Sequence, residues 1–466
     1  MNTAKKLQVF IIFLFLFGIF TKAELLSWND KSRIDTIRSL VEHHTFIIDN
    51  IISNPLFTTG DKYLYNNHFY SDKPPLLSIY GAGVYLFLKN LFNISFENHY
   101  KLASYLITLL TIGILSSLSL VWFYKILIEE FKIDEKWSDI TILTVGTGTL
   151  VLPYSIAFNN HIVSGSLLLL SFYYLLKSKD NKIYSTAATG IIISLAGNID
   201  LNCFLFVPFC FLYFLMTKSF KSGAIFILSC VPLIAIYFWL NFYLSGSIIP
   251  PATNPVLWDY PGSVFNKTNL SGLATHYSGS DLIGYAFNMI LGSRGLISHT
   301  PILLFSIFAL TKIFRLKHFQ YKTEYLYIST ASLAFILIYI FRTKNYSGLD
   351  YGVRWFATPM LLLCLPLAHI GNEIRRSRVT RILFVVTATL SIILSFVGTY
   401  DPFVRNLITL QLPLLGTFNS DYTFIISTSL IATHSSTSYK LRLIFSAFII
   451  YFLFRRLLKN LKSSNP

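Results

Sequence analysis

The 466-residue chain is dominated by apolar side chains, which excludes an ordinary soluble globular domain. Hydrophobic residues make up 53% of it and charged residues only 13%, whereas soluble chains carry about 25% charged residues. The net charge of +16 does not indicate nucleic-acid binding, because the Lys and Arg residues cluster between long apolar runs, as the positive-inside rule predicts. We therefore expect an all-α, polytopic integral membrane bundle with no nucleic-acid partner.

The N-terminal part of the chain predicts one membrane helix and a long polar loop. Residues 7–22 are apolar and follow two lysines, so they fit either a secretory signal peptide or a first transmembrane helix. We favour the helix, because no clear cleavage site follows. Residues 24–75 form the loop, in which Ile34, Ile37 and Leu40 recur at helical spacing. This pattern predicts an amphipathic helix that lies in the membrane interface.

The rest of the chain contains many further apolar runs that are suited to crossing a bilayer. They fall near residues 76–92, 102–128, 140–157, 161–176, 183–198, 200–216, 222–243, 300–314, 324–341, 353–370, 380–397 and 441–458. Together with the first helix they predict about 11–13 transmembrane helices. Two more long loops interrupt the series. They span 244–299, with a semi-apolar stretch at 281–297, and 398–440, with an apolar piece at 422–432 that is a candidate re-entrant segment.

The basic clusters predict an orientation that contains one inconsistency. Counting back from the basic C-terminal tail, taken as inside, puts the loop 244–299 outside, and counting forward from Lys5 and Lys6 puts the loop 24–75 outside. The two counts disagree by one crossing between residues 76 and 128, so one span there is miscounted, re-entrant or split. We expect both long loops on the same outer face.

Charged residues beside apolar runs mark candidate sites, because a charge at the bilayer centre costs roughly 2.5–3.5 kcal/mol on insertion scales. The first cluster contains Asp30 and Arg33, just after the first helix. Three residues apart, they share one face of a helix, and Asp30 has the chemistry of a general base for an acceptor hydroxyl. The alternative makes Asp30 a helix cap and leaves Arg33 solvated.

Three further clusters place a cation at the start of an apolar run. Asp72 and Lys73 precede two prolines that stiffen a helix start, and Lys73 either meets a phosphate at headgroup depth or simply snorkels. Arg294 and Arg354 each lie near glycine, where a phosphate can approach. A guanidinium offers a planar fork for phosphate oxygens. These clusters therefore predict phosphate ligands.

The order of these clusters resembles the integral-membrane GT-C glycosyltransferases, especially the family 39-type group of protein O-mannosyltransferases and the aminoarabinose transferase that modifies lipid A. The likeness is most specific over residues 28–85, where SRIDTIRSLVEHHTFIID and YNNHFYSDKPPLLSIYGAGVY look like the group's first outer loop and second helix. It continues through GSRGLISHTPILL and YSGLDYGVRWFATPMLLL to residue 370. One departure is Lys31, which stands where the group often has a second acidic residue. Asp35, Asp49 and Asp72 are candidates to replace it.

The resemblance implies a glycosyltransferase that moves a sugar from a polyprenyl-phosphate carrier to an acceptor hydroxyl of a lipid, glycan or protein. The reaction would be a direct displacement at the outer membrane face with a carboxylate base, for which Asp30 is the candidate. The residues expected to bind substrate are Arg33, Asp72, Lys73, Arg294 and Arg354.

The same resemblance implies a setting and a set of partners. We expect a multi-pass protein of a bacterial or archaeal plasma membrane that works on the cell envelope. Its partners would be the polyprenyl-phosphate sugar and membrane lipids, with no separate cofactor and no metal. The GT-C-like module would span residues 1–400, and residues 401–466 would hold an outer loop and a last transmembrane helix without a soluble domain.

Two other functions stay open, and two polar residues have ordinary interpretations. A flippase or transporter of lipid-linked sugars predicts charges in mid-span and similarity between two halves of the chain, whereas few such charges and no obvious repeat occur. A glycan polymerase or ligase would use a large outer loop from the C-terminal half. We expect His161 to be a helix-start residue near water and Asp200 an exposed turn residue. Asp200 and its neighbours Asn198 and Asn202 nevertheless have groups suited to a substrate hydroxyl.

Overall fold

The computed structural model describes residues 3–180, 182–276, 278–292, 294–348 and 350–403, two strands, and residues 444–446, 448–449, 451–452 and 455. The strands β3 (Leu407–Gln411) and β4 (Thr423–Ser427) pair antiparallel, so part of the predicted re-entrant piece 422–432 is a strand. Most of the predicted last helix, 441–458, lies outside the described residues, as does most of the loop 398–440.

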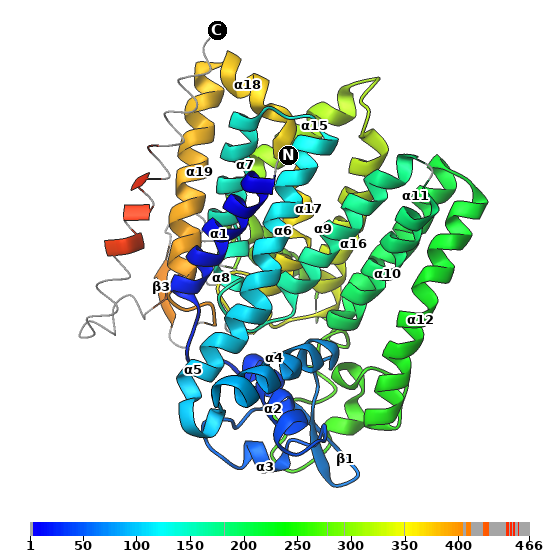
Figure 1. Cartoon of the computed structure of the whole chain (residues 1–466), viewed down its shortest axis with the longest axis vertical. Helices are drawn as coiled ribbons and strands as arrows, with labels where there is room; N and C mark the ends of the chain where they lie inside the picture. The colour runs from blue at the N-terminus through cyan, green and yellow to red at the C-terminus, as the bar shows by residue number, and fades with distance from the viewer. Residues whose placement is uncertain are drawn as a thin grey trace.

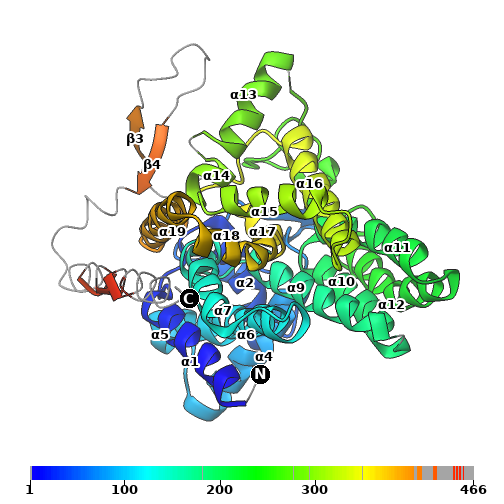
Figure 2. The same cartoon turned by 90° about the horizontal axis from the view of Figure 1, so that it is seen from above.

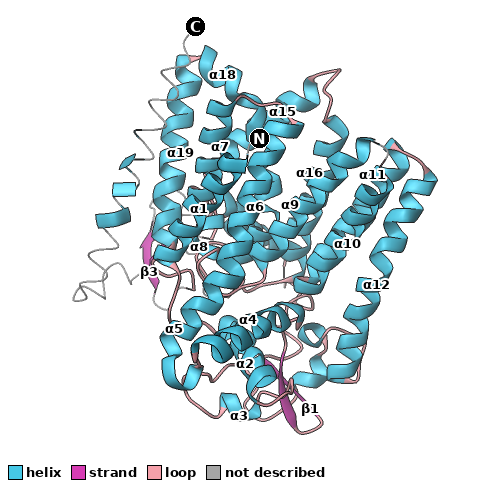
Figure 3. Ribbon diagram, viewed as in Figure 1, coloured by secondary structure: helices cyan, strands magenta, loops and turns pink. Residues whose placement is uncertain are grey.

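Long apolar helices run side by side between two ends of the molecule (Figures 1 and 3). Six helical stretches among the described residues are long and apolar enough to cross a membrane. They are α1 (Thr3–Phe20), the run Phe96–Glu130 that contains α5 (Phe96–Thr108) and α6 (Ile114–Lys125), α12 (Phe220–Ser245), α16 (Lys322–Arg342), the run Arg354–Arg376 that contains α17 (Ala357–Cys364) and α18 (Gly371–Arg376), and α19 (Arg378–Gly398). This arrangement confirms the predicted all-α polytopic bundle.

Shorter helices complete the bundle. They are α7 (Glu135–Thr147), α8 (Val151–Tyr154), α9 (His161–Lys177), α10 (Ile183–Ile199), α11 (Phe206–Thr217) and α15 (Leu303–Arg315). Viewed from above, α9 and α17 lie near the middle, and α11 and α12 lie at one edge (Figure 2). The central helices therefore have neighbours on most sides, as their buried side chains require.

The two ends of the bundle differ in charge. One end, here called the basic end, contains the start of α1, the connections 178–180, 218–219 and 316–321, and the short helix α18. Its lysines and arginines form ion pairs with acidic residues of neighbouring helices. These pairs are Lys5–Asp139, Lys177–Glu130, Lys179–Glu324, Lys312–Glu373 and Arg375–Asp134, with N–O distances of 2.6–3.1 Å. The opposite end, called the loop end, carries the loops 24–75 and 246–274.

The predicted crossing at 76–92 is wrong. These residues form α4 (Leu76–Phe92), which packs on α2 (Trp28–Glu42) at the loop end (Figure 1). The Ser78 hydroxyl donates to the Arg33 carbonyl at 3.2 Å, and the Phe96 amide at the start of α5 donates to the Tyr85 hydroxyl at 3.2 Å. Both ends of α4 therefore lie at the loop end, and the single run Phe96–Glu130 makes the only crossing between residues 76 and 130. With this single crossing, the two orientation counts, from the N-terminus and from the C-terminus, no longer disagree.

The helix α2 forms where a helix was predicted, but it is buried rather than interfacial. Its apolar residues Ile34 and Ile37 are fully buried, and so are the polar residues Ser32 and Asp35 on other faces. The reason is that α4 covers α2 closely: a Cβ on Gly81 of α4 would lie 2.5 Å from Ile37 Cδ1. The loop end is therefore a packed layer with polar groups inside it.

A hairpin and a proline-rich loop complete the loop end. After α3 (Asp49–Ile52), strands β1 (Lys62–Tyr65) and β2 (His68–Ser71) pair antiparallel, and the turn residues Asn66 and Asn67 have φ of 50° and 64°, as a type I′ turn requires.

The loop that follows α12 packs against this hairpin. It contains the 3-10 helices Pro251–Thr253 and Pro255–Trp258, and then α13 (Gly279–Ile290) and α14 (Leu296–His299) cover most of the predicted semi-apolar stretch 281–297. The Tyr63 hydroxyl donates to the Leu244 carbonyl at 3.1 Å, and the Tyr260 hydroxyl donates to the Lys62 carbonyl at 3.0 Å. The two long loops thus lie on the same end of the molecule, as predicted.

Replacing Gly165 tests the close contact between α9 and α17. A Cβ there would lie 2.5 Å from the Thr358 carbonyl oxygen, and backbone cannot yield as a flexible side chain can. We expect Gly165→Ala to lower the free energy of unfolding by about 1–3 kcal/mol, measured by thermal unfolding in detergent. Gly83→Ala in α4 is the matched control, because no atom lies within 4 Å of its added Cβ. Equal effects of the two substitutions would contradict the packing.

Candidate active site

The loop end encloses a cavity of about 780 Å³. Its walls come from the start of α2, the hairpin and the two prolines before α4, the start of α9, the end of α10, the ends of α12 and α16, and the segments 250–272 and 343–355. Four of the six residues predicted for the site line it, namely Arg33, Asp72, Lys73 and Arg354. Segments that are far apart in the sequence therefore line the same cavity.

Arg33 is the most unusual of these residues. It is only 1% exposed, and its Nε and Nη1 atoms have no hydrogen-bond partner among the described residues. Burial lowers the pKa of Arg33 to about 10, with Arg354 adding to the effect and Asp72 and Asp61 opposing it. The side chain is thus a charged donor with free capacity, not the solvated residue of the alternative interpretation.

Lys73 lies between two carboxylates. Its Nζ is 2.7 Å from Asp61 Oδ2 and 2.9 Å from Asp72 Oδ2, and all three residues line the cavity. Burial raises the pKa of Asp72, whereas Lys73 and Arg33 oppose that rise, and Asp72 Oδ1 has no hydrogen-bond partner among the described residues. Asp61 is not among the residues predicted from the sequence, because no local motif marks it.

The second arginine, Arg354, is held by the segment just before α17. Its Nη1 lies 3.3 Å from both Asp350 carboxylate oxygens, and its Nη2 donates to the Ser347 carbonyl at 3.4 Å. Burial raises the pKa of Asp350 to about 6, and Arg354 opposes this rise. Since Arg354 Nε has no partner in the described part of the chain, this guanidinium also keeps a free donor.

Arg294 does not line the cavity. Its Nη1 donates to the carbonyls of Asp350 at 2.6 Å and Gly348 at 3.3 Å, so it supports the segment that carries Arg354. Its neighbour Ser293 lies outside the described residues. The structure therefore places Arg294 behind the cavity wall, and a direct contact with substrate stays a prediction.

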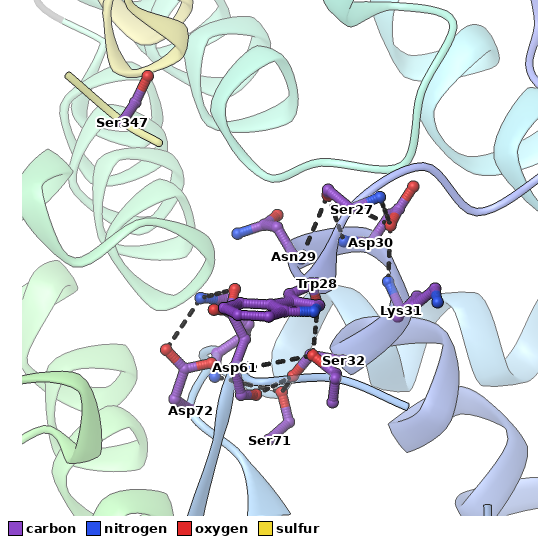
Figure 4. A network of polar contacts seen from close by, with 12 residues as sticks. Ser27, Trp28, Asn29, Asp30, Lys31, Ser32, Asp61, Ser71, Asp72 and Ser347 are labelled. Atoms are coloured by element: carbon purple, nitrogen blue, oxygen red, sulfur yellow. Dashed lines mark hydrogen bonds and ion pairs between the residues drawn. The ribbon is translucent and has the colours of Figure 1, made fainter. Parts of the chain in front are cut away.

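Asp30 is also absent from the cavity wall. Its carboxylate accepts hydrogen bonds from the backbone amides of Leu26, Ser27 and Lys31 at 2.7–2.8 Å. Ser27 in turn caps the helix by accepting from the Asp30 amide, which completes a capping box at the start of α2 (Figure 4). These bonds favour the capping interpretation, and the role of Asp30 as a base stays a prediction.

The other candidate carboxylates divide in the same way. Asp35 is fully buried in α2 and does not line the cavity, and Asp49 pairs with His68 at 2.8 Å away from it. Only Asp72 of the three faces the cavity.

The expectation that Asp200 is an exposed turn residue is wrong. His161 begins α9, as predicted, but its side chain is buried instead of lying in water. Both side chains are buried, both line the cavity, and His161 Nδ1 lies 2.8 Å from Asp200 Oδ2. The pair joins the start of α9 to the end of α10. Asn202 lines the cavity beside it, whereas Asn198 donates to the Ser194 and Leu233 carbonyls and does not.

Replacing Asp30 tests its capping role. Asp30→Ala removes the acceptor of three backbone amides, and we expect it to lower the free energy of unfolding by about 0.5–2 kcal/mol. Asp30→Asn keeps one oxygen and should lose less. Thermal unfolding in detergent measures both, and an unchanged midpoint for Asp30→Ala would contradict the capping role.

The same residue predicts a pH effect with a defined sign. Burial raises the pKa of folded Asp30 to about 6, above its ordinary value, while hydrogen bonds from Leu26 and Ser27 oppose the rise. The folded state then binds more protons than the unfolded state between pH 4 and 6, so stability falls as the pH rises through that window. We expect the wild type to lose stability relative to Asp30→Asn over this range. Parallel unfolding curves at pH 4 and pH 7 would contradict this.

Comparison with known proteins identifies the fold. No family model and no curated protein matches the sequence. The crystal structure of ArnT from Cupriavidus metallidurans bound to undecaprenyl phosphate matches 84% of this chain and 64% of ArnT, at 11% identity and a TM-score of 0.54. The apo oligosaccharyltransferase of Archaeoglobus fulgidus matches 87% of this chain and 57% of its own length, at 12% identity and a TM-score of 0.48.

This chain thus spans less than two thirds of each of these proteins. At such low identity the likeness to ArnT establishes the fold alone. The fold shared with ArnT agrees with the resemblance of the sequence motifs to the GT-C glycosyltransferases.

Proposed function

We propose that this chain transfers a sugar from a polyprenyl-phosphate carrier to an acceptor hydroxyl. The observation that carries the proposal is Arg33, a buried guanidinium with unpaired nitrogens on the wall of the loop-end cavity. Burying a charge without hydrogen bonds costs several kcal/mol, so the arrangement suits an anion that arrives with the substrate. ArnT, which shares the fold, was crystallised with undecaprenyl phosphate.

The charges of the wall support a phosphate as this anion. Lys73 is already paired with Asp61 and Asp72, and Arg354 with Asp350. Arg33 has no such ion pair in the described part of the chain, and Arg354 keeps its Nε free. Charge-assisted bonds from guanidinium to phosphate are among the strongest in proteins, so Arg33 and Arg354 are the proposed phosphate ligands.

The reaction we propose is a direct displacement at the anomeric carbon. The acceptor oxygen forms a bond to that carbon, the bond between the carbon and the phosphate oxygen breaks, and the electron pair leaves with the carrier phosphate. Cations placed at the phosphate stabilise the charge that develops there. The acceptor proton passes to a base on the cavity wall, and Asp30 is hydrogen-bonded elsewhere.

Orientation supports an outer-face reaction. The positive-inside rule places the basic end on the inner side of the membrane, so the cavity at the loop end would face outward. The acceptor would then be a hydroxyl of a lipid, glycan or protein on the outer side. The proposed setting remains a bacterial or archaeal plasma membrane.

A flippase is the main alternative, and the cavity argues against it. Transport of a lipid-linked sugar needs a polar path that continues toward the opposite side. The charged residues of this cavity all come from the loop end of the bundle, whereas the charges at the basic end are joined in ion pairs. A polar site that is confined to one end of the bundle suits a chemical reaction better than transport of a lipid-linked sugar across the membrane.

The proposed activity can be tested with purified protein in liposomes. The donors are undecaprenyl-phosphate-linked hexoses and pentoses, and the acceptors are lipid A, octyl glucoside and a threonine peptide. We expect release of undecaprenyl phosphate with at least one donor and glycosylation of one acceptor class. Carrier movement between leaflets without donor consumption would instead identify a flippase.

Replacing Arg33 tests the phosphate site. We expect Arg33→Gln to weaken undecaprenyl phosphate binding by about 1.5–3 kcal/mol, because a hydrogen bond to a charged group is lost. Titration of tryptophan fluorescence measures the Kd. Arg38→Gln on the same helix is the matched control, because Arg38 pairs with Glu42 and does not line the cavity. Equal binding by the wild type and Arg33→Gln would contradict the site.

A further inference from the structure

The buried pair of His161 and Asp200 has no part in the phosphate site described above. Both side chains are only 6% exposed, yet both border the cavity. Thr358 of α17 donates from its hydroxyl to the same Asp200 oxygen at 3.0 Å. Three helices thus fix this carboxylate, and the carboxylate fixes the imidazole ring.

The pairing determines which ring nitrogen carries the proton. Asp200 accepts at Oδ2, so the Nδ1 atom of His161 is the donor and Nε2 keeps its lone pair. No described residue makes a hydrogen bond to Nε2, since the contacts of the ring are made through Nδ1. A ring nitrogen with a free lone pair on a polar cavity wall is a proton acceptor.

The carboxylates of the wall are less suited to this task. Asp61 and Asp72 both hold Lys73, and Asp350 holds Arg354. Each of these carboxylates is paired with a cation, whereas Nε2 of His161 has no hydrogen-bond partner in the described part of the chain. A carboxylate behind the imidazole further orients it and stabilises the cation that forms on proton transfer.

We propose that His161 is the general base for the acceptor hydroxyl and that Asp200 positions it, an inference that rests on the proposed transferase function. The O–H bond of the acceptor breaks, its proton moves to His161 Nε2, and the oxygen electron pair forms the bond to the anomeric carbon. The bond to the carrier phosphate breaks with its electron pair on the phosphate. The imidazolium afterwards gives its proton to water, which restores the neutral ring.

The charged groups around the ring fit this sequence. Burial is the main cause that disfavours a positive charge on His161; Arg33 and Arg354 add to this effect, and Asp200 opposes it. Before the donor binds, burial and the arginines thus keep the ring neutral and able to accept a proton. A carrier phosphate bound by the two arginines offsets their charge, so the ring becomes a stronger base when the donor is in place.

Donor consumption by His161 variants tests the proposal in the liposome assay. The wild-type rate should rise with pH and then level off, because the neutral ring is the active form. We expect His161→Gln to slow release of undecaprenyl phosphate by roughly 10²–10⁴-fold and to remove this pH dependence, with an unchanged Kd for undecaprenyl phosphate. Asp200→Asn should also lower the rate while carrier binding is retained.

A matched control and three outcomes make the test decisive. His276→Gln should keep the wild-type rate, because His276 contacts the Ile340 carbonyl and does not line the cavity. A wild-type rate and pH profile in His161→Gln would overturn the proposal. Loss of carrier binding together with activity in both His161→Gln and Asp200→Asn would make the pair structural and overturn it too. A wild type that consumes no donor would remove the transferase function and the base with it.

Discussion

The loop end of this protein holds a buried guanidinium, Arg33, two of whose nitrogens have no hydrogen-bond partner in the described part of the chain. Arg33 lies on a buried helix, and no side chain in the described residues bonds to its Nε or Nη1. A fold can keep such a group only if the surrounding packing provides the stability that the charge removes. The cover of α4 on α2, the capping box and the aromatic contacts of the hairpin provide that support. Because Arg33 lines the cavity, a substrate anion is the proposed partner of these nitrogens.

Support from outside the cavity is a general feature of this site. Asp30 fixes the start of the helix that carries Arg33, and Arg294 holds the carbonyls of the segment that carries Arg354. Neither touches the cavity, yet both set the direction of a side chain that does. Such groups have the same residue types as ligands, and short motifs cannot separate the two roles. A direct role of Asp30 or Arg294 in the site stays a prediction.

Sequence patterns could predict features that depend on neighbouring residues, but not contacts between segments that are far apart in the chain. Four residues predicted for the site line the cavity, and each is a charged residue near a long apolar run, a pattern that the sequence shows; they are Arg33, Asp72, Lys73 and Arg354. The Ser27-x-x-Asp30 spacing is a capping-box signal, so the local role of Asp30 was also present in the sequence. The contact between His161 and Asp200 depends on how α9 packs against α10, and no periodicity encodes it. Hydropathy likewise could not show that α4 stays at one end, since its length suits a crossing.

The position of α4 bears on the depth at which the cavity would lie in a membrane. Four of its apolar side chains are 46–66% exposed, namely Leu86, Phe87, Leu91 and Phe92. One side of this helix is therefore as apolar as the outer surface of the bundle. A helix of that kind, held at one end of the molecule, suits the acyl chains of a single leaflet. Under the proposed function, the cavity beside it would open near the phosphates of that leaflet. A lipid-borne sugar would reach it by sliding sideways, without its tail ever leaving the hydrocarbon.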